Sequence, residues 1–139
     1  SSITLFVKNN SEKQFFDERF GSGEYFGSCE DADYIVQALS QNHKIFYIPD
    51  IQVWHPAQKN SEFNEEKIAS YGLGFGAFAC KNFNLPIVIL FLEVIIYHML
   101  RYFLSMVKRK ENEKNAERIS VVSRLNGWKI YKKFNLNRG

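Results

Sequence analysis

Cysteine is scarce in this sequence, and the few cysteines form no recognisable ligand set. Cys29 and Cys80 lie far apart and belong to no C-x-x-C or Cys/His cluster, which excludes the common zinc-binding patterns. Two free thiols in a reducing compartment are the default interpretation, with a single disulfide between them as the alternative.

The chain also lacks a methionine at its start. It begins with Ser1 inside a strand-like run, so we expect a fragment or a processed product, and the absence of a visible signal peptide is then uninformative. A length of 139 residues suits one modest domain and is too short for two full ones.

Charge is nearly absent from the middle of the chain and unevenly divided between its ends. Residues 1–82 carry seven Lys/Arg and eleven Asp/Glu, whereas residues 108–139 carry ten Lys/Arg and three Glu. Residues 83–107 contain one residue of each sign, Glu93 and Arg101. The pattern indicates an acidic front, an apolar middle and a basic tail.

Three short apolar runs in the front part are typical of strands. They cover residues 3–7, 44–49 and 51–55, and polar residues or prolines follow them. A stretch rich in glycine and aromatic residues, 15–28, indicates an ordered irregular loop. A helix is predicted next, over residues 30–42, where apolar side chains recur at helical spacing.

A second helix is predicted from Ser61 or Asn64 to about residue 83. Small residues recur on one of its faces at spacings of three and four, as close backbone approach to a neighbouring element requires: Ala69, Gly72, Gly76 and Ala79 or Cys80. The Gly-Leu-Gly-Phe-Gly run within it follows no strand, so we reject a dinucleotide-binding loop.

The longest apolar run, Leu85–Val107, predicts a helix long enough to cross a hydrocarbon core of about 30 Å. Its polar residues are expected on one side of that helix: Glu93, Tyr97, His98, Arg101, Ser105 and the following Lys108. A membrane-spanning helix whose polar side faces protein and an amphipathic helix lying in the interface both fit this pattern. A buried helix of a soluble domain fits the length less well.

The basic tail is predicted to contain a solvated charge run and then a short amphipathic helix that ends at Asn126 and Gly127. Beyond that point aromatic residues and lysines alternate, which suits a membrane surface with anionic lipid: Trp128, Lys129, Tyr131, Lys132, Lys133 and Phe134. A merely soluble tail is the alternative. No recognised nucleic-acid-binding motif is present, so no nucleic-acid partner is expected.

Three carboxylates crowd the start of the first predicted helix. Ser28 and Asp31 match a capping pattern, and Glu30, Asp31 and Asp33 would lie in the first turn, where the helix dipole favours negative charge. Capping alone explains this acidity, and a catalytic base is the alternative. His55, after the last strand-like run, is either a hydrogen-bonded structural residue or a metal or phosphate contact.

Three stretches in this order resemble the C-terminal half of a family 2 inverting glycosyltransferase with the GT-A fold. They read FDERFGSGEYFGSCEDADYIVQAL, HKIFYIPDIQVWHP and YGLGFGAFACKN. The ordered resemblance spans residues 1–82 closely, and the apolar helix and the RLNGW segment fit it more loosely. The resemblance implies an α/β fold, a partial nucleotide-diphospho-sugar transferase-like half-domain followed by C-terminal membrane-associated helices.

The resemblance also implies roles for individual residues. Asp31 matches the catalytic base, which would take the proton of the acceptor hydroxyl as that hydroxyl attacks the anomeric carbon, and Glu30 would sit beside it. His55 matches a contact to a divalent cation, Mg²⁺ or Mn²⁺, or to the nucleotide diphosphate. Substrate contacts are expected from three further residues, of which the last is also expected to support the helix start: Gly23, Glu24 and Asp33.

The family's nucleotide-binding half, with its own D-x-D motif after a strand, has no counterpart in this sequence. The string Asp31-Ala32-Asp33 opens a helix after a glycine-rich loop, so we interpret it as the base motif. The donor site is therefore expected mostly outside this chain, in a longer parent or a separate N-terminal half, and the isolated chain is expected to be inactive.

The sequence thus predicts three segments. Residues 1–82 would form the acceptor-side part of the transferase, residues 83–108 a membrane-spanning or interfacial helix, and residues 109–139 a basic amphipathic tail. The expected partners are a nucleotide-sugar, a lipid-linked or polysaccharide acceptor and the cytoplasmic face of a membrane. The alternative is a non-catalytic membrane-anchoring or partner-binding remnant of a split glycosyltransferase.

Overall fold

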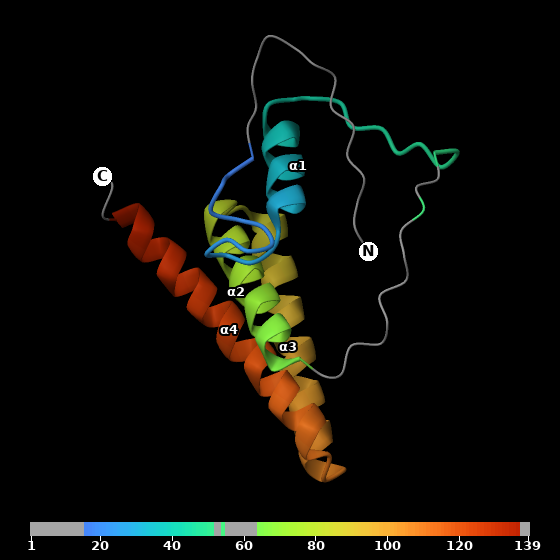
Figure 1. Cartoon of the computed structure of the whole chain (residues 1–139), viewed down its shortest axis with the longest axis vertical. Helices are drawn as coiled ribbons and strands as arrows, with labels where there is room; N and C mark the ends of the chain where they lie inside the picture. Colours follow the sequence, from blue (N-terminus) through green and yellow to red (C-terminus); the bar gives the residue numbers. More distant parts are fainter. Residues whose placement is uncertain (1–15, 52–53, 55–63, 137–139) are drawn as a thin grey trace.

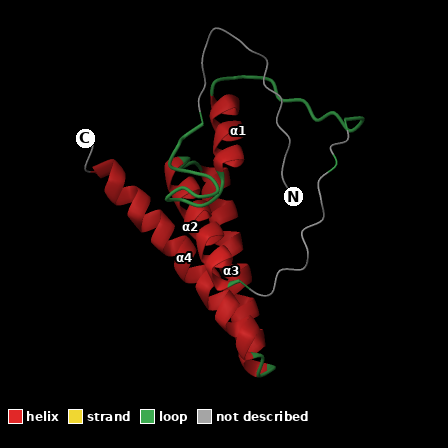
Figure 2. Ribbon diagram, viewed as in Figure 1, coloured by secondary structure: helices red, strands yellow, loops and turns green. Residues whose placement is uncertain are grey.

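The computed structural model describes residues 16–51, 54 and 64–136, and these residues form four helices (Figure 1). The helices are α1, Glu30–Ser40; α2, Glu65–Lys81; α3, Leu85–Val107; and α4, Glu111–Leu136. Figure 2 shows that no strand occurs in the described part of the chain, where only an isolated bridge joins Phe20 and Phe26.

The predicted α/β, partial GT-A fold is therefore wrong. Residues 44–51 and Trp54, which the sequence assigns to two strands, lie outside any helix or strand, and the first predicted strand, residues 3–7, lies outside the described residues. A strand needs a hydrogen-bonded neighbour to be stable, and no described segment pairs with residues 44–51. Their apolar side chains are instead exposed, Tyr47 to 90%.

Helix α4 is the element on which α2 and α3 both pack (Figure 1). It runs parallel to α2, since Glu65 at the start of α2 accepts a hydrogen bond from Asn115 and Gly72 further along lies against Ser123. It runs antiparallel to α3, because Arg101 near the end of α3 contacts Glu117 near the start of α4. The helical unit thus brings together residues from all three predicted segments.

Glycines allow the backbones of α2 and α4 to approach each other closely. A Cβ on Gly76 would lie 1.9 Å from the carbonyl oxygen of Arg124, and one on Gly127 would lie 2.0 Å from that of Leu73. The predicted small-residue face of α2 is confirmed at Gly72 and Gly76. The predicted helix stop at Asn126 and Gly127 is wrong, because Gly127 is an interior contact residue of a continuous α4.

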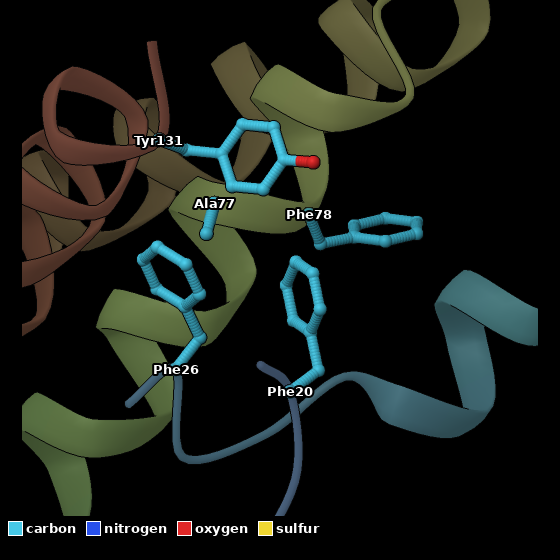
Figure 3. Close-up of a cluster of buried hydrophobic side chains, with 5 residues drawn as sticks. All are labelled: Phe20, Phe26, Ala77, Phe78 and Tyr131. Carbon is cyan, nitrogen blue, oxygen red and sulfur yellow. The ribbon is translucent and has the colours of Figure 1, made fainter. Parts of the chain in front are cut away.

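The larger core cluster joins the loop before α1 to α2 and α4. Phe20 and Phe26 from the loop lie against Ala77 and Phe78 of α2 and Tyr131 of α4 (Figure 3). The rings of Phe20 and Phe26 have centroids 5.3 Å apart, and Phe26 and Tyr131 are 5.7 Å apart. The irregular loop predicted over residues 15–28 is confirmed from residue 16 onward, and these aromatic contacts give it its order.

A second cluster joins α3 to the other two long helices. Phe91 and Ile95 of α3 and Ala79 of α2 are buried together, with Trp128 of α4 packed on them. The Phe91 and Trp128 rings have centroids 5.0 Å apart. Trp128 and Tyr131, which the sequence assigns to a membrane–water interface, therefore pack against protein, whereas the lysines beside them are exposed.

The predicted bounds of the apolar helix are confirmed by α3. Asn84 begins it by accepting a hydrogen bond from the Ile87 N–H at 3.0 Å, and Pro86 lies in its first turn, where proline is tolerated. This helix is long and apolar enough to span a membrane, and only 6% of its most apolar window is buried in the protein.

Candidate functional site

The candidate site is the N-terminus of α1, where Glu30 and Asp31 are the first two residues of the helix. Both are half-buried. Asp31 accepts a hydrogen bond from the Ala32 N–H at 2.7 Å, and Glu30 lies beside Gly21, whose Cβ would be 3.5 Å from the Glu30 Cδ. Neither carboxylate forms an ion pair with another described residue. The helix start therefore presents two carboxylates whose charges no side chain of the described part neutralises.

The capping interaction predicted for Ser28 is wrong. Cys29 is the N-cap residue, in the left-handed conformation with φ 73°, and no side chain caps α1. Ser28 is drawn away from the helix because its hydroxyl donates to the carbonyl of Tyr71 in α2 at 3.3 Å. A sequence pattern cannot reveal this, since the two residues are 43 positions apart.

Close packing on α2 holds the loop that leads into α1. A Cβ on Gly74 would lie 2.3 Å from the Ser28 hydroxyl, and one on Gly27 would lie 1.8 Å from the Ser70 hydroxyl. The Gly-Leu-Gly-Phe-Gly run is helical, which confirms that it is no dinucleotide-binding loop. Its middle glycine, Gly74, packs against the loop, whereas Gly72 and Gly76 pack against α4.

A buried ion-pair network fixes the body of α1 to the end of α2. Asp33 is only 1% exposed. Its carboxylate accepts hydrogen bonds from Lys81 Nζ at 2.6 Å, Asn82 Nδ2 at 2.8 Å and Gln37 Nε2 at 2.5 Å. A carboxylate covered in this way does not contact a substrate directly, so Asp33 supports the helix start in this arrangement.

The network continues through Lys81 to the loop and to α4. Lys81 Nζ donates to Asp17 at 2.7 Å, Arg19 binds Asp17 through two nitrogens at 2.8 and 2.6 Å, and Arg19 also donates to the Tyr131 hydroxyl at 2.9 Å. The hydrogen bonds from Arg19 and then Lys81 hold the pKa of Asp17 well below its usual range, although burial opposes them. Burial alone would lower the pKa of Lys81, but Asp17 and Asp33 raise it above its ordinary value.

The other predicted site residues lie on the loop or outside the described chain. Gly23 and Glu24 are exposed at the tip of the loop, and Gly23 has φ 93°, a conformation that favours glycine. Gly23 and Glu24 therefore lie on the same loop that leads to Glu30 and Asp31. His55, the predicted metal or diphosphate contact, lies outside the described residues.

The two aspartates of the D-x-D string differ in their exposure to solvent. Asp33 is enclosed by the end of α2, whereas Asp31 remains half-exposed at the start of α1. Among the described residues, no group of three or more His, Cys, Asp or Glu side chains is arranged to hold a metal ion. Because His55 lies outside the described residues, the expected divalent-cation site stays a prediction, and no chemical step is assigned to a metal.

The cysteines are free thiols, as expected from their spacing. Burial raises the pKa of the Cys29 thiol, against the smaller opposing effect of a hydrogen bond from Ser28. Burial likewise raises the pKa of Cys80. Both thiols are therefore poor thiolate nucleophiles at neutral pH.

Sequence reasoning missed the residues that hold the site in place. Lys81 and Asn82 were only the end of a helix in the sequence, and Asp17 and Arg19 were only part of a loop. A weak signal exists, because Asp17 lies in the FDERFG phrase that carries part of the family resemblance. The pairing itself is not visible, since Asp33 and Lys81 are 48 positions apart.

Comparison of the chain with models of protein families, with curated proteins and with solved structures gives no match.

Proposed function

We propose that this chain is the acceptor-side, membrane-associated part of an inverting glycosyltransferase that transfers a sugar from a nucleotide-sugar to a lipid-linked or polysaccharide acceptor. One observation carries the proposal. The half-exposed carboxylates of Glu30 and Asp31 begin a helix that Asp33 ties, through Lys81 and Asn82, to the end of α2. The apolar helix α3 starts directly after that point.

In the proposed mechanism, Asp31 is the general base. Its carboxylate accepts the proton of the acceptor hydroxyl as the oxygen attacks the anomeric carbon, and the nucleoside diphosphate leaves from the opposite face. Glu30 precedes Asp31 at the start of α1, and we assign Glu30 to hydrogen bonding with the acceptor. We place Gly23 and Glu24, on the loop before α1, in contact with the acceptor.

The ordered resemblance of residues 1–82 to family 2 glycosyltransferases supports this assignment. One of its three stretches, HKIFYIPDIQVWHP, was expected to form strands, and its described residues form none. The donor site is proposed to lie mostly outside this chain, in a preceding part or a separate N-terminal half. A segment of the described chain suits such a partner. Residues 45–51 and Trp54 expose several large apolar side chains, including Phe46 to 76% and Trp54 to 87%, and a partner would cover them.

The proposed location is the cytoplasmic face of a membrane. Helix α3 supplies the apolar surface, and the exposed cations that follow it would favour an anionic inner leaflet. A lipid-linked acceptor presented at that surface is within reach of a site attached to the start of α3.

The test is the Asp31→Asn substitution in the protein expressed with the coding sequence upstream of Ser1. Removing the base should lower transfer by about two to four orders of magnitude while the far-ultraviolet circular dichroism spectrum stays unchanged. Transfer is measured as nucleoside diphosphate released from a panel of nucleotide-sugars in the presence of a lipid extract.

Glu66→Gln is the matched control, because Glu66 is also a first-turn carboxylate, in α2, and is exposed. It should leave transfer unchanged. Equal turnover of the wild type and Asp31→Asn would contradict the assignment of the base.

The second candidate function is a non-catalytic membrane-anchoring or partner-binding module. The exposed apolar side chains of residues 45–51 and Trp54 and the exposed apolar surface of α3 favour it. It predicts that no nucleotide-sugar supports turnover, that the Asp31→Asn variant behaves as the wild type, and that the chain still binds membranes.

A further inference from the structure

The side of α3 that faces away from the protein is apolar along its whole length. Residues on it recur at spacings of three and four, and each is at least 44% exposed: Leu85, Ile89, Leu92, Ile96, Met99, Leu100, Phe103 and Val107. Exposed apolar faces of this extent mark contacts with another apolar phase. Such a face fits a spanning helix, an interfacial helix or a contact with a second chain, so the decision depends on what lies beside it.

Three polar residues of α3 are already paired or buried within the protein. His98 and Arg101 both contact the carboxylate of Glu117 on α4 at 2.5 Å, and the Glu117 side chain is only 8% exposed. Ser105, also on this side, is buried. His98, Arg101 and Ser105 therefore need no further transmembrane partner.

Helix α4 accompanies α3 through its middle, and the outer side of α4 carries polar residues beside the exposed apolar Val122 and Leu125. Glu117 lies beside His98 and Trp128 lies beside Phe91, so the part of α4 between them is level with the centre of α3. Arg118, Asn126 and Lys129 belong to or adjoin this part and are exposed. If α3 crossed a bilayer, α4 would carry these groups into the hydrocarbon core, which is strongly unfavourable.

A polar edge runs beside the apolar face. Glu93, Tyr97 and Arg101 follow one another at intervals of four residues, and all three are exposed. Glu93 lies near the middle of the helix, where a spanning orientation would place its carboxylate in hydrocarbon. In a helix that lies in the membrane plane, the same edge is level with the headgroups.

The end of the apolar face carries three exposed cations, Lys108, Arg109 and Lys110, of which Lys110 also pairs with Glu113. Arg109 occupies the left-handed position that closes α3, with φ 53°, and the N–H groups of Arg109 and Lys110 donate to the carbonyls of Met106 and Ser105. Glycine is the usual residue there. The chain instead places a guanidinium next to the apolar face, which complements anionic lipid headgroups.

We propose that α3 lies in the plane of an anionic membrane leaflet, with its apolar face in the acyl region, its Glu93–Tyr97–Arg101 edge at the headgroups, and the 108–110 cations on lipid phosphates. The partner is a lipid surface, and α3 does not cross it. The inference deepens the membrane association proposed above, and it does not need the chain to be an enzyme.

The depth of α3 in the bilayer distinguishes the two orientations. In a Cys29→Ser, Cys80→Ser background of the full chain, single cysteines at Leu85, Ile96 and Val107 carry an environment-sensitive fluorophore. The protein is bound to phosphatidylcholine vesicles that contain phosphatidylglycerol, and quenching by lipids labelled at different depths is measured. An interfacial helix gives the same shallow depth at all three positions. A deep Ile96 between two shallow ends would overturn the proposal and leave membrane association intact.

Two variants test the lipid contacts without relying on depth. Ile96→Glu should lower pelleting with these vesicles about tenfold or more, whereas Val122→Glu, at an exposed apolar position of α4, should not. Arg109→Gly is expected to keep the fold, because it relieves a left-handed position, and to weaken binding to phosphatidylglycerol vesicles selectively. Equal binding of Ile96→Glu and the wild type would overturn the proposal.

A failure of the underlying membrane association has a different signature. The wild-type chain would then not pellet with phosphatidylcholine vesicles, whether or not they contain phosphatidylglycerol. Sedimentation would show a stable dimer that Ile96→Glu converts to monomer. That outcome would assign the apolar face to a second copy of the chain. The nucleoside diphosphate assay remains an independent measure of transfer in every case.

Discussion

Lys81 is the residue on which the geometry of the candidate site depends most. Its ammonium group is shared by Asp17 and Asp33, at 2.7 and 2.6 Å, so it neutralises two covered carboxylates from different segments. Asn82, the next residue, adds a hydrogen bond to Asp33. Two consecutive side chains at the end of α2 therefore hold both the loop and α1.

The Lys81→Met substitution should lower the free energy of unfolding by about 2–4 kcal/mol, because it leaves the almost fully buried carboxylate of Asp33 without its cation. Denaturant unfolding in a mild detergent measures this loss. Lys114→Met is the matched control, since Lys114 pairs with the exposed Glu111 one turn away, and it should change stability by less than about 0.5 kcal/mol. A loss that is equally small in Lys81→Met would show that the carboxylates find other partners.

The same network predicts how stability varies with pH. The folded pKa of Asp17 is depressed, so its contribution is complete above the unfolded pKa of about 4 and is lost as the pH falls through the folded value. The folded pKa of Lys81 is raised, so its contribution is complete below about 10 and is lost as the pH rises through the folded value. The network should therefore stabilise the protein fully between about pH 4 and 10.

Asp17→Asn tests the acidic side of this range. The difference in unfolding free energy between the wild type and this variant should be constant near neutral pH and should shrink below about pH 4. Glu18→Gln, which changes an exposed neighbour, should give a curve parallel to that of the wild type. A difference that persists undiminished in acid would contradict the role of the Asp17 charge.

At the scale of helices, the interface of α2 and α4 depends on residues without side chains. Gly76 and Gly127 each lie where a Cβ would come within about 2 Å of a carbonyl oxygen of the partner helix, at 1.9 and 2.0 Å. Neither contact can be relieved by turning a side chain, because the opposing atoms are backbone. The helices must separate to admit a methyl group.

Gly76→Ala should therefore destabilise the protein by about 2–3 kcal/mol, even though alanine is the better helix former. Thermal or denaturant unfolding measures the loss. Asn126→Ala is the control, since Asn126 is exposed beside Gly127 on α4, and it should be neutral within about 0.5 kcal/mol. Stabilisation by Gly76→Ala would mean that α2 and α4 do not pack at this distance.

The elements that the sequence predicts well are those set by local composition. The bounds of α3 follow from one long, mostly apolar run, and Asn64 caps the start of α2 because its side chain accepts from the Lys67 N–H. The stop at Gly127 was a wrong prediction because glycine also permits close helix packing, which only the partner helix reveals. The strands over residues 44–55 were wrong where described because strand formation requires pairing, which a local pattern does not contain.

The candidate site was also predictable only where it depends on local sequence. Glu30 and Asp31 do begin a helix, as their position before an apolar-periodic run indicates. The different surroundings of Asp31 and Asp33 were not predictable, because they depend on Lys81 and Asn82 and on the way α2 passes beside α1.

At the scale of the whole molecule, α4 is the element that joins the others. It contacts α2 along the glycine interface, α3 through Glu117 and Trp128, and the loop through Tyr131. Helices α2 and α3 contact each other far less, although only three residues separate them. The unit is thus organised by the last helix in the described chain.

A chain that ends at residue 110 should consequently lose the order of α2 and of the loop, and not merely the last helix. Circular dichroism should show a helical loss larger than the 26 residues of α4 account for, and limited proteolysis should cut within residues 16–28. A peptide of residues 111–136 added in trans should restore protection. A loss confined to α4 would show that α2 and the loop fold without it.

The joint between α2 and α3 has a mechanical consequence. Asn82 ends α2 and binds Asp33 of α1, and two positions later Asn84 begins α3. Helices α2 and α3 are both packed on α4, so α3 cannot tilt alone on this short joint. The start of α1 is therefore expected to stay at a fixed distance from the apolar face of α3.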